Sequence, residues 1–207
     1  LTRQLNDPFV SQTHERGLRS RAAIKLEQMD DKHKFLRPHM NIVDLGCAPG
    51  GWLQIVAKRC KIDAGIGRLV GIDLLETEAV AGAHILKGDI NDHSMLKEIK
   101  SCLKGNADIV LSDMAAATTG HRLTDHLRTM SLLEVALEFA CEVLSDGGVF
   151  LGKSFRGGAD ESLLAFLKNR FKKVKHLKPS ASRAESVETY LLAVGFVSSK
   201  NSQNFNN

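Results

Sequence analysis

The stretch that most constrains the fold runs from Asn41 to Trp52 and reads NIVDLGCAPGGW. Its first part, Ile42 to Leu45, is a short apolar run interrupted by one acid, which suits a buried strand. A turn rich in glycine follows at 46–51, and an apolar helical pattern begins at Trp52. Glycines let the backbone approach a ligand closely, and the free N–H groups of a helix N-terminus attract one. The stretch predicts a binding loop above a strand, although a tight turn without a ligand would have the same pattern.

The composition sets the broad class. The chain has 207 residues, of which 43% are hydrophobic, enough for one domain with a sizeable core. Its net charge of +4 is compatible with an anionic partner. The four cysteines are scattered without a CxxC pair, so we expect reduced thiols and no metal site. No apolar run approaches the ~18 residues of a membrane span, and no signal-peptide pattern opens the chain. We therefore expect a cytoplasmic protein that does not associate with membranes.

Predicted strands and helices alternate from residue 41 onward. Helices are predicted at 94–103, 125–144 and 161–171, and further strands at 68–73, 83–89, 107–113, 149–155, 172–177 and 188–196. This alternation predicts an α/β fold in which a mostly parallel seven-stranded sheet carries helices on both faces. The last two strands have no crossover helix between them, so we expect a hairpin and one antiparallel strand.

Three acids follow three of the predicted strands. Asp73, Asp89 and Asp113 all lie at carboxyl ends, where ligands bind in open α/β sheets. An acid in the place of Asp73 can accept hydrogen bonds from the hydroxyls of an adenosine ribose, and Asp89 could meet the adenine amino group. Each acid alone could instead be a helix cap or a turn residue. Together, beside a glycine-rich loop, they favour a ligand that contains adenosine.

The choice between a nicotinamide and a methyl donor rests on the loop and on the chain length. The loop has the form GxxxGG, whereas dinucleotide-binding loops have GxGxxG. The chain also lacks a second half-domain that could hold a hydride acceptor. A methyltransferase needs only one such domain, so an oxidoreductase is the weaker alternative.

Several separated motifs also match a known family in order. They are the loop Asp44–Trp52, the element Gly17–Leu26, Ser112–Ala115, the Gly-Lys-Ser-Phe of the fifth strand, and Ser182–Tyr190. From about Leu5 to Phe196 the chain resembles the FtsJ family of ribose 2′-O-methyltransferases. The resemblance implies a Rossmann-like, S-adenosylmethionine-dependent methyltransferase fold. The bacterial branch of that family methylates a uridine in the A loop of 23S ribosomal RNA.

The residue pattern divides the chain into three parts, and the resemblance places a site on it. Residues 1–40 would form a basic helical extension packed on the core, residues 41–197 the methyltransferase domain, and residues 198–207 a disordered tail. Asp73 would bind the donor's ribose and Asp89 its adenine. The family's Lys–Asp–Lys–Glu set falls on Lys25, Asp113, Lys153 and Glu188. The other donor-binding positions implied are Gly46, Pro49, Gly50, Gly51, Trp52 and Asp113. No metal is expected.

The residue types suggest roles for this set. A ribose hydroxyl holds its proton tightly, so its in-line attack on a sulfonium methyl needs fixed geometry and a base. We hypothesise that Lys153 is that base or steers the hydroxyl lone pair, that Asp113 positions it, and that Lys25 contacts substrate. Glu188 would orient a lysine. Lys25 and Glu188 could also be ordinary surface residues, whereas Lys153 interrupts an apolar strand, where an unpaired lysine is unfavourable.

Two positions depart from the family pattern. Many relatives continue Ser-Asp-Met-Ala with Pro-Asn, whereas this chain has Ala116-Ala117. The change bears on the rigidity of the loop beside the donor and leaves the catalytic acid in place. Cys47 stands where relatives commonly have alanine, and we interpret it as a small packed residue.

Basic residues at both ends of the chain indicate an RNA partner. Seven Lys or Arg and no acid lie between Lys168 and Arg183, and further cations precede the core at Arg16, Arg19, Arg21, Lys32 and Lys34. They suggest a phosphate-binding surface, although edge-strand lysines that block strand pairing or a solvated helical face are alternatives. We expect a monomer that acts on 23S RNA within the 50S subunit or a late precursor. A tRNA ribose methyltransferase and a non-catalytic assembly factor are the other hypotheses.

Overall fold

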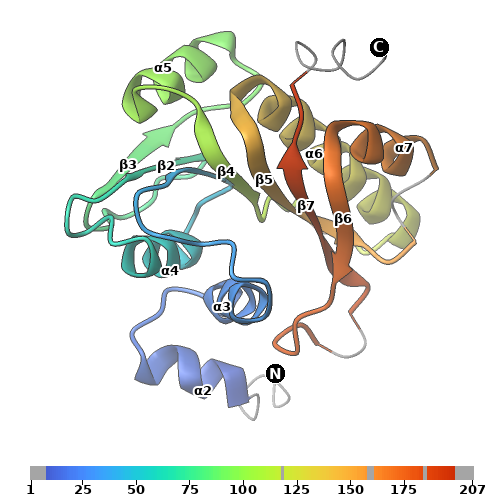
Figure 1. Cartoon of the computed structure of the whole chain (residues 1–207). Helices are drawn as coiled ribbons and strands as arrows, with labels where there is room; N and C mark the ends of the chain where they lie inside the picture. Colours follow the sequence, from blue (N-terminus) through green and yellow to red (C-terminus); the bar gives the residue numbers. More distant parts are fainter. Residues whose placement is uncertain (1–7, 118, 158–160, 184–185, 199–207) are drawn as a thin grey trace, which may run out of the picture.

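The computed structural model describes residues 8–117, 119–157, 161–183 and 186–198. One seven-stranded sheet has the order β3-β2-β1-β4-β5-β7-β6 (Figure 1). Its strands are β1 (Asn41–Leu45), β2 (Arg68–Asp73), β3 (Ala83–Lys87), β4 (Ala107–Ser112), β5 (Leu144–Phe155), β6 (Phe171–Leu177) and β7 (Glu188–Phe196). Only β7 runs antiparallel to its neighbours, β5 and β6. The predicted mostly parallel α/β sheet with one antiparallel strand is confirmed.

Helices cover both faces of the sheet, as predicted (Figure 1). They are α2 (Pro8–Glu15), α3 (Ala22–His33), α4 (Gly51–Arg59), α5 (His93–Leu103), α6 (Arg122–Val143) and α7 (Glu161–Arg170). One hydrophobic cluster packs α5, α6 and α7 against the sheet. A second cluster packs α3 and α4 against the opposite face. This arrangement leaves the carboxyl ends of β1, β2 and β4 free to build a site.

Most element boundaries lie within three residues of those predicted. The exception is β5, which begins at Leu144 rather than at residue 149. Leu144 pairs with Ala107, and the register then shifts before Ile109 pairs with Val149. The extra residues at 145–148 therefore form an irregularity in the ladder, which a search for an apolar run cannot detect.

The N-terminal segment belongs to the packed structure. Ala23, Leu26 and Met29 of α3 are at most 2% exposed and lie in the same cluster as α4. An extension packed on the core agrees with this, and the boundary at residue 40 stays a prediction. Residues 199–207 of the predicted tail lie outside the described part of the chain. In the described part, no helix has the length and apolar character needed to cross a membrane.

Candidate active site

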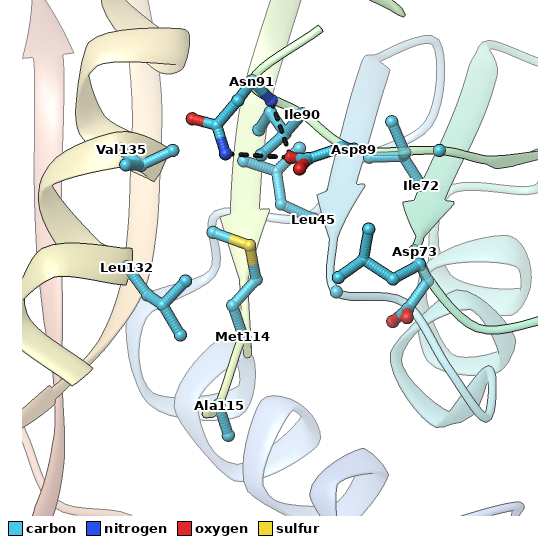
Figure 2. Close-up of a pocket in the computed structure, with 13 residues that line it drawn as sticks. Leu45, Ile72, Asp73, Asp89, Ile90, Asn91, Met114, Ala115, Leu132 and Val135 are labelled. Atoms are coloured by element: carbon cyan, nitrogen blue, oxygen red, sulfur yellow. Dashed lines mark hydrogen bonds between the residues drawn. The ribbon is translucent and has the colours of Figure 1, made fainter. Parts of the chain in front are cut away.

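A cavity of about 210 Å³ opens at the carboxyl ends of β1, β2 and β4 (Figure 2). Apolar side chains form most of its wall, and two of the predicted acids, Asp73 and Asp89, complete it. The lining residues are Leu45, Gly46, Ile72, Asp73, Leu74, Gly88, Asp89, Ile90, Asn91, Met114, Ala115, Leu132 and Val135. The cavity thus combines an apolar slot with carboxylate acceptors.

Both acids are held by local hydrogen bonds. Asp73 accepts from the N–H of Ala48 at 2.9 Å and from the N–H of Leu75 at 2.8 Å. It therefore ties the end of β2 to the glycine-rich loop. Asp89 Oδ1 accepts from the backbone N–H of Asn91 at 2.9 Å and from its side-chain amide at 2.8 Å (Figure 2). A carboxylate has about four acceptor sites, so each acid keeps capacity for a ligand hydroxyl or amino group.

The glycine-rich loop meets this cavity only at its beginning. Gly46 lines the cavity, has a φ of 74°, and a Cβ there would lie 2.7 Å from Met114 Cγ. Pro49, Gly50, Gly51 and Trp52 are not among the lining residues. Gly50 and Gly51 instead lie under the N-terminal segment, since a Cβ at Gly50 would be 2.5 Å from Arg19 Nη1 and one at Gly51 would be 2.3 Å from Ser20 Oγ. Close packing therefore accounts for Gly51, whereas Gly50 also has a φ of 107°, which favours glycine whatever the space.

Trp52, which the resemblance implies as a donor-binding position, is not among the residues that line this cavity. It is 3% exposed, its Nε1 donates to the carbonyl of Ala22 at 2.7 Å, and its ring lies 5.9 Å from that of Tyr190. Only its backbone N–H, in the first turn of α4, is placed as a free donor at a helix N-terminus. A donor-binding role for Trp52 would therefore use that N–H and not the indole.

The four residues of the predicted catalytic set form two ion pairs. Lys153 Nζ lies 2.9 Å from Asp113 Oδ1 and also donates to the Asp113 carbonyl at 2.9 Å. Lys25 Nζ lies 2.6 Å from Glu188 Oε1. All four side chains are 11–16% exposed. Asp113 directly precedes Met114 and Ala115 of the cavity, so the Lys153–Asp113 pair lies next to the cavity wall.

Tyr190 joins the two ion pairs, and sequence reasoning had not singled it out. Its hydroxyl donates to Asp113 Oδ1 at 2.9 Å and lies 3.4 Å from Glu188 Oε1. Ser182 also donates to Glu188 Oε1, at 2.9 Å. Burial, reinforced by the two carboxylates, raises the pKa of Tyr190 well above its ordinary value, so the phenol stays a donor. The available signal was the alternation of β7, which puts Glu188 and Tyr190 on one face.

The ion pairs control the charge on Glu188. Burial opposes its ionisation, but Lys25, and more weakly Lys153 and Ser182, outweigh that effect and lower its pKa below the ordinary value. Glu188 is therefore ionised at neutral pH. The set as a whole joins two lysines and two acids through one neutral phenol.

Asp44 carries a second unpredicted feature. It lies near the end of β1, is fully buried, and neither carboxyl oxygen has a hydrogen-bond partner among the described residues. Burial, and then the nearby Asp113 and Asp73, raise its pKa well above the ordinary value. Asp44 therefore takes up a proton far more readily than a surface acid does.

Cys47 fits the interpretation as a packed residue. It is 3% exposed, and burial raises the pKa of its thiol to about 12. Among the residues that the structure describes, no group of three or more His, Cys, Asp or Glu side chains is placed to hold a metal ion.

A separate cavity of about 230 Å³ lies on the other side of the ion pairs. It is lined by Arg21, Lys25, Arg183, Ser186 and Glu188. Two of the four predicted catalytic residues thus face this basic cavity, while Asp113 adjoins the first one. One ion pair therefore contributes to the basic cavity, and the other adjoins the first cavity.

Several cations that we predicted to bind phosphate have partners within the protein. Arg16 forms two hydrogen bonds with the carboxylate of Glu27, at 2.7 and 2.8 Å. Arg19 donates to the carbonyls of Pro49, Glu78 and Ala79 at 2.7–3.2 Å. Arg21 donates to the carbonyl of Ala181 from two nitrogens. These arginines have structural roles that a count of charges cannot reveal.

Comparisons with known proteins agree with this geometry. Residues 18–196 match the family model described as FtsJ-like methyltransferase. A ribosomal RNA large subunit methyltransferase E of Parvibaculum lavamentivorans is 53% identical, covering 95% of this chain and 80% of the relative. The same-named protein of Mesorhizobium japonicum is 54% identical, covering 95% and 74%.

Solved structures point the same way. A Plasmodium falciparum chain described as a ribosomal RNA methyltransferase has a TM-score of 0.77 and 29% identity, covering 87% of this chain and 99% of that one. The N-methyltransferase NodS of Bradyrhizobium japonicum, 16% identical with a TM-score of 0.53, shares the fold; the match covers 93% of this chain and 99% of that one. The chain belongs to the FtsJ-like methyltransferase family.

Proposed function

We propose that this protein transfers a methyl group from S-adenosylmethionine to the ribose 2′-hydroxyl of a uridine in the A loop of 23S ribosomal RNA. The observation that carries the proposal is the position of the Lys153–Asp113 pair. It adjoins a cavity suited to adenosine on one side and connects, through Tyr190 and Glu188, to a basic cavity on the other. The target nucleotide follows from the family resemblance alone, whereas the names of the relatives indicate large-subunit ribosomal RNA as the substrate.

The residues present fit the proposed donor. Asp73 supplies acceptors for two ribose hydroxyls, and Asp89 supplies one for an exocyclic amino group. Ile72, Leu74 and Ile90 provide apolar walls for a planar ring. When bound, S-adenosylmethionine supplies the electrophilic methyl.

The protein's own groups would fix the acceptor and move its proton. The 2′-oxygen forms a bond to the methyl carbon as the sulfur–carbon bond breaks, and the hydroxyl proton must leave in the same process. Lys153 is the group placed to act on this oxygen: as an ammonium it would donate a hydrogen bond that orients the oxygen lone pair, and after losing its own proton it would accept the proton of the hydroxyl. Asp113 holds Lys153 through both its carboxylate and its carbonyl. Positioning of this kind and general base assistance together account for large rate enhancements, with the base contributing ~10²–10⁴-fold.

The remaining members would orient the acceptor. Lys25 lies in the basic cavity, where an ammonium can contact a phosphate or a ribose oxygen. Glu188 holds Lys25, and Tyr190 links Glu188 to Asp113. We propose a cytoplasmic enzyme that acts on the 50S subunit or its late precursor.

The test replaces Lys153 with Ala. Radiolabelled methyl transfer would be measured on 50S particles, free 23S RNA and tRNA, and the modified nucleotide would be mapped. We expect transfer to fall ~10²–10⁴-fold while calorimetry still detects donor binding. Lys97→Ala, which changes an exposed residue of α5, is the control variant and should transfer the methyl group at the wild-type rate.

Three outcomes would contradict parts of the proposal. Near-normal turnover by Lys153→Ala would remove Lys153 from the chemistry. Methylation confined to tRNA would replace the substrate. Donor-independent RNA binding without any transfer by the wild-type protein would indicate a non-catalytic assembly factor.

A further inference from the structure

A cavity of about 350 Å³ lies apart from the active centre, between the end of α3 and the β6–β7 hairpin. Its lining combines aliphatic side chains with cations, and no acid is among them. The residues are His33, Lys34, Phe35, Arg37, Met40, Gly147, Val149, Lys173, Lys175, Leu192 and Val194. The volume falls in the range of small-ligand sites, about 300–1,000 Å³.

The register of the hairpin explains this mixture. Lys173 pairs with Val194 and Lys175 pairs with Leu192, so the two lysines and the two apolar residues project from the same face of the sheet. Lys173 and Lys175 are exposed, whereas Leu192 is 2% exposed. The cavity therefore has an apolar floor and a positively charged rim.

The rim cations differ from the arginines near the active centre in having few partners. Lys34 Nζ lies 3.8 Å from Asp31 Oδ1 and is largely exposed. Within the described ranges, no ion pair or side-chain hydrogen bond engages Arg37, Lys173 or Lys175. Arg16, Arg19 and Arg21 are bound to carboxylate or carbonyl oxygens. Unlike those three arginines, the cations at the rim of this cavity are therefore available to an external anion.

His33 adds a polar group to the floor. Its Nε2 is buried and has no hydrogen-bond partner in the described part of the chain. Burial, together with Lys175, Lys32 and Lys173, lowers the pKa of His33 and keeps the imidazole neutral. A neutral imidazole can donate one hydrogen bond and accept another, which suits the edge of a base.

From these observations we propose that the cavity is a second nucleotide-binding site, which holds a nucleotide of the substrate RNA away from the methylated ribose. The rim cations Lys34, Arg37, Lys173 and Lys175 contact phosphates, and the apolar floor with His33 receives the base or sugar. An apolar floor distinguishes this site from a simple phosphate-binding patch. The inference rests on the proposed function, because it assigns part of the same RNA to a defined place.

The distance from the active centre suits a continuous strand. Lys25 of the catalytic set and His33 lie on the same helix, about 12 Å apart along its axis at ~1.5 Å per residue. That span equals roughly three to four stacked nucleotides at ~3.4 Å each. α3 thus connects the acceptor cavity with the second site.

The alternative explanation is that edge-strand lysines protect β6 from pairing with another chain. That role requires positive charge anywhere along the edge. It requires neither an adjoining cavity nor a particular face of the strand. The two explanations therefore differ in what happens when charge is removed inside the cavity and outside it.

The test compares two double variants with equal loss of charge. Lys173→Gln/Lys175→Gln removes two rim cations, and Lys97→Gln/Lys104→Gln removes two exposed cations, on α5 and at its end, that neither line the cavity nor belong to the basic segments of the sequence. Methyl transfer to 50S particles would give kcat and KM, and binding to 23S RNA would be measured over a series of KCl concentrations. All substituted residues are exposed, so both proteins should unfold at the wild-type temperature.

We expect the cavity variant to raise KM and the RNA dissociation constant about tenfold, roughly threefold for each exposed lysine–phosphate pair that is removed, with kcat unchanged. The association constant for RNA should also depend less on salt. The magnitude of the slope of its logarithm against the logarithm of the KCl concentration should decrease by ~1.4, since each phosphate of a single strand contributes ~0.7. The control variant should change affinity less than about twofold. Arg37→Gln, a third rim substitution, should weaken binding about threefold.

Equal effects of the two double variants would overturn the site, because only total charge would matter. Unchanged RNA binding in the cavity variant, with self-association at high concentration, would overturn it in favour of edge protection. Failure of the proposed function looks different. The wild-type protein would then transfer no methyl group to ribosomal RNA, and the salt slopes of the two variants would still decide whether the cavity binds RNA.

Discussion

The replacement of Asp44 by Asn tests the most unusual electrostatic feature of the fold. Asp44 is buried in the central strand β1, beside Gly71 of β2 and Leu111 of β4. Burial, and then Asp113 and Asp73, raise its pKa. Because the folded state holds this proton more tightly than the unfolded chain, unfolding releases a proton at any pH between the two pKa values. The Asp44 contribution to stability is therefore largest in acid and declines as the pH rises.

The size of the effect follows from proton linkage. One group that is protonated in the folded state and ionised in the unfolded state changes the free energy of unfolding by about 1.4 kcal/mol per pH unit. The loss begins near the ordinary value of 3.8 and ends at the raised pKa of the folded state. The amide of the Asp44→Asn variant has no charge at any pH. This variant should be about as stable as the wild type near pH 4 and gain on it by up to ~1.4 kcal/mol per unit above that.

The assay is thermal or urea unfolding at half-unit steps from pH 4 to pH 7.5, without ligand. A gain of ~1.4 kcal/mol corresponds to roughly 3–6 °C in Tm for a chain of this size. Asp63→Asn, at an exposed position, is the matched control and should run parallel to the wild type. Parallel curves for Asp44→Asn and the wild type would refute the reasoning, because they would require an ionised Asp44 with a compensating partner.

Two further predictions concern the contacts around the site. Glu188→Gln should reduce stability by about 1–3 kcal/mol at pH 7 by leaving Lys25 without its carboxylate. Since Lys25 outweighs burial and lowers the Glu188 pKa, this stabilisation is present above about pH 4.5 and is lost as the pH falls through the folded-state value. Unfolding curves that converge below pH 4 would support this, and a constant difference would contradict it. Arg19→Gln should weaken donor binding about tenfold in calorimetry, with kcat retained at saturating donor, because Arg19 joins the carbonyl of Pro49, in the loop that begins at the cavity-lining Gly46, to those of Glu78 and Ala79. Unchanged affinity together with a lower Tm would indicate a purely structural contact.

The sheet was predictable because its strands carry strong local signals. β2 and β7 match their predicted bounds, since each is a continuous apolar run limited by turn residues. The antiparallel strand was predictable because no crossover helix lies between β6 and β7. Two neighbouring parallel strands need such a connection, whatever their composition. The predicted start of β5 was wrong because Gly147 and Gly148 are typical of a turn. In the structure the strand passes through them, with a shift in its register to β4.

The residue types of the site were predictable from the sequence, whereas the hydrogen-bond partners of several of its side chains were not. The acids at the ends of β2 and β3 reached one cavity because parallel strands end at the same edge. The role of Trp52 was not predictable, since a tryptophan at the first turn of a helix can point to a ligand or to a neighbouring helix. Here the indole N–H donates a hydrogen bond to the carbonyl of Ala22. Arginine clusters are ambiguous in the same way, because guanidinium groups bind carbonyls as readily as phosphates.

The N-terminal segment connects the glycine-rich loop, helix α4 and strand β7. Arg19 bonds to the glycine-rich loop, Ala22 accepts from Trp52 in the helix after that loop, and Lys25 pairs with Glu188 of β7. One short stretch of chain thus touches the donor side, the core and the acceptor side in order. Helix α3, which carries Ala22 and Lys25, ends at His33 beside the second cavity. Packing of α3 therefore sets the distance between the reacting ribose and any RNA held there, which a flexible basic arm could not do.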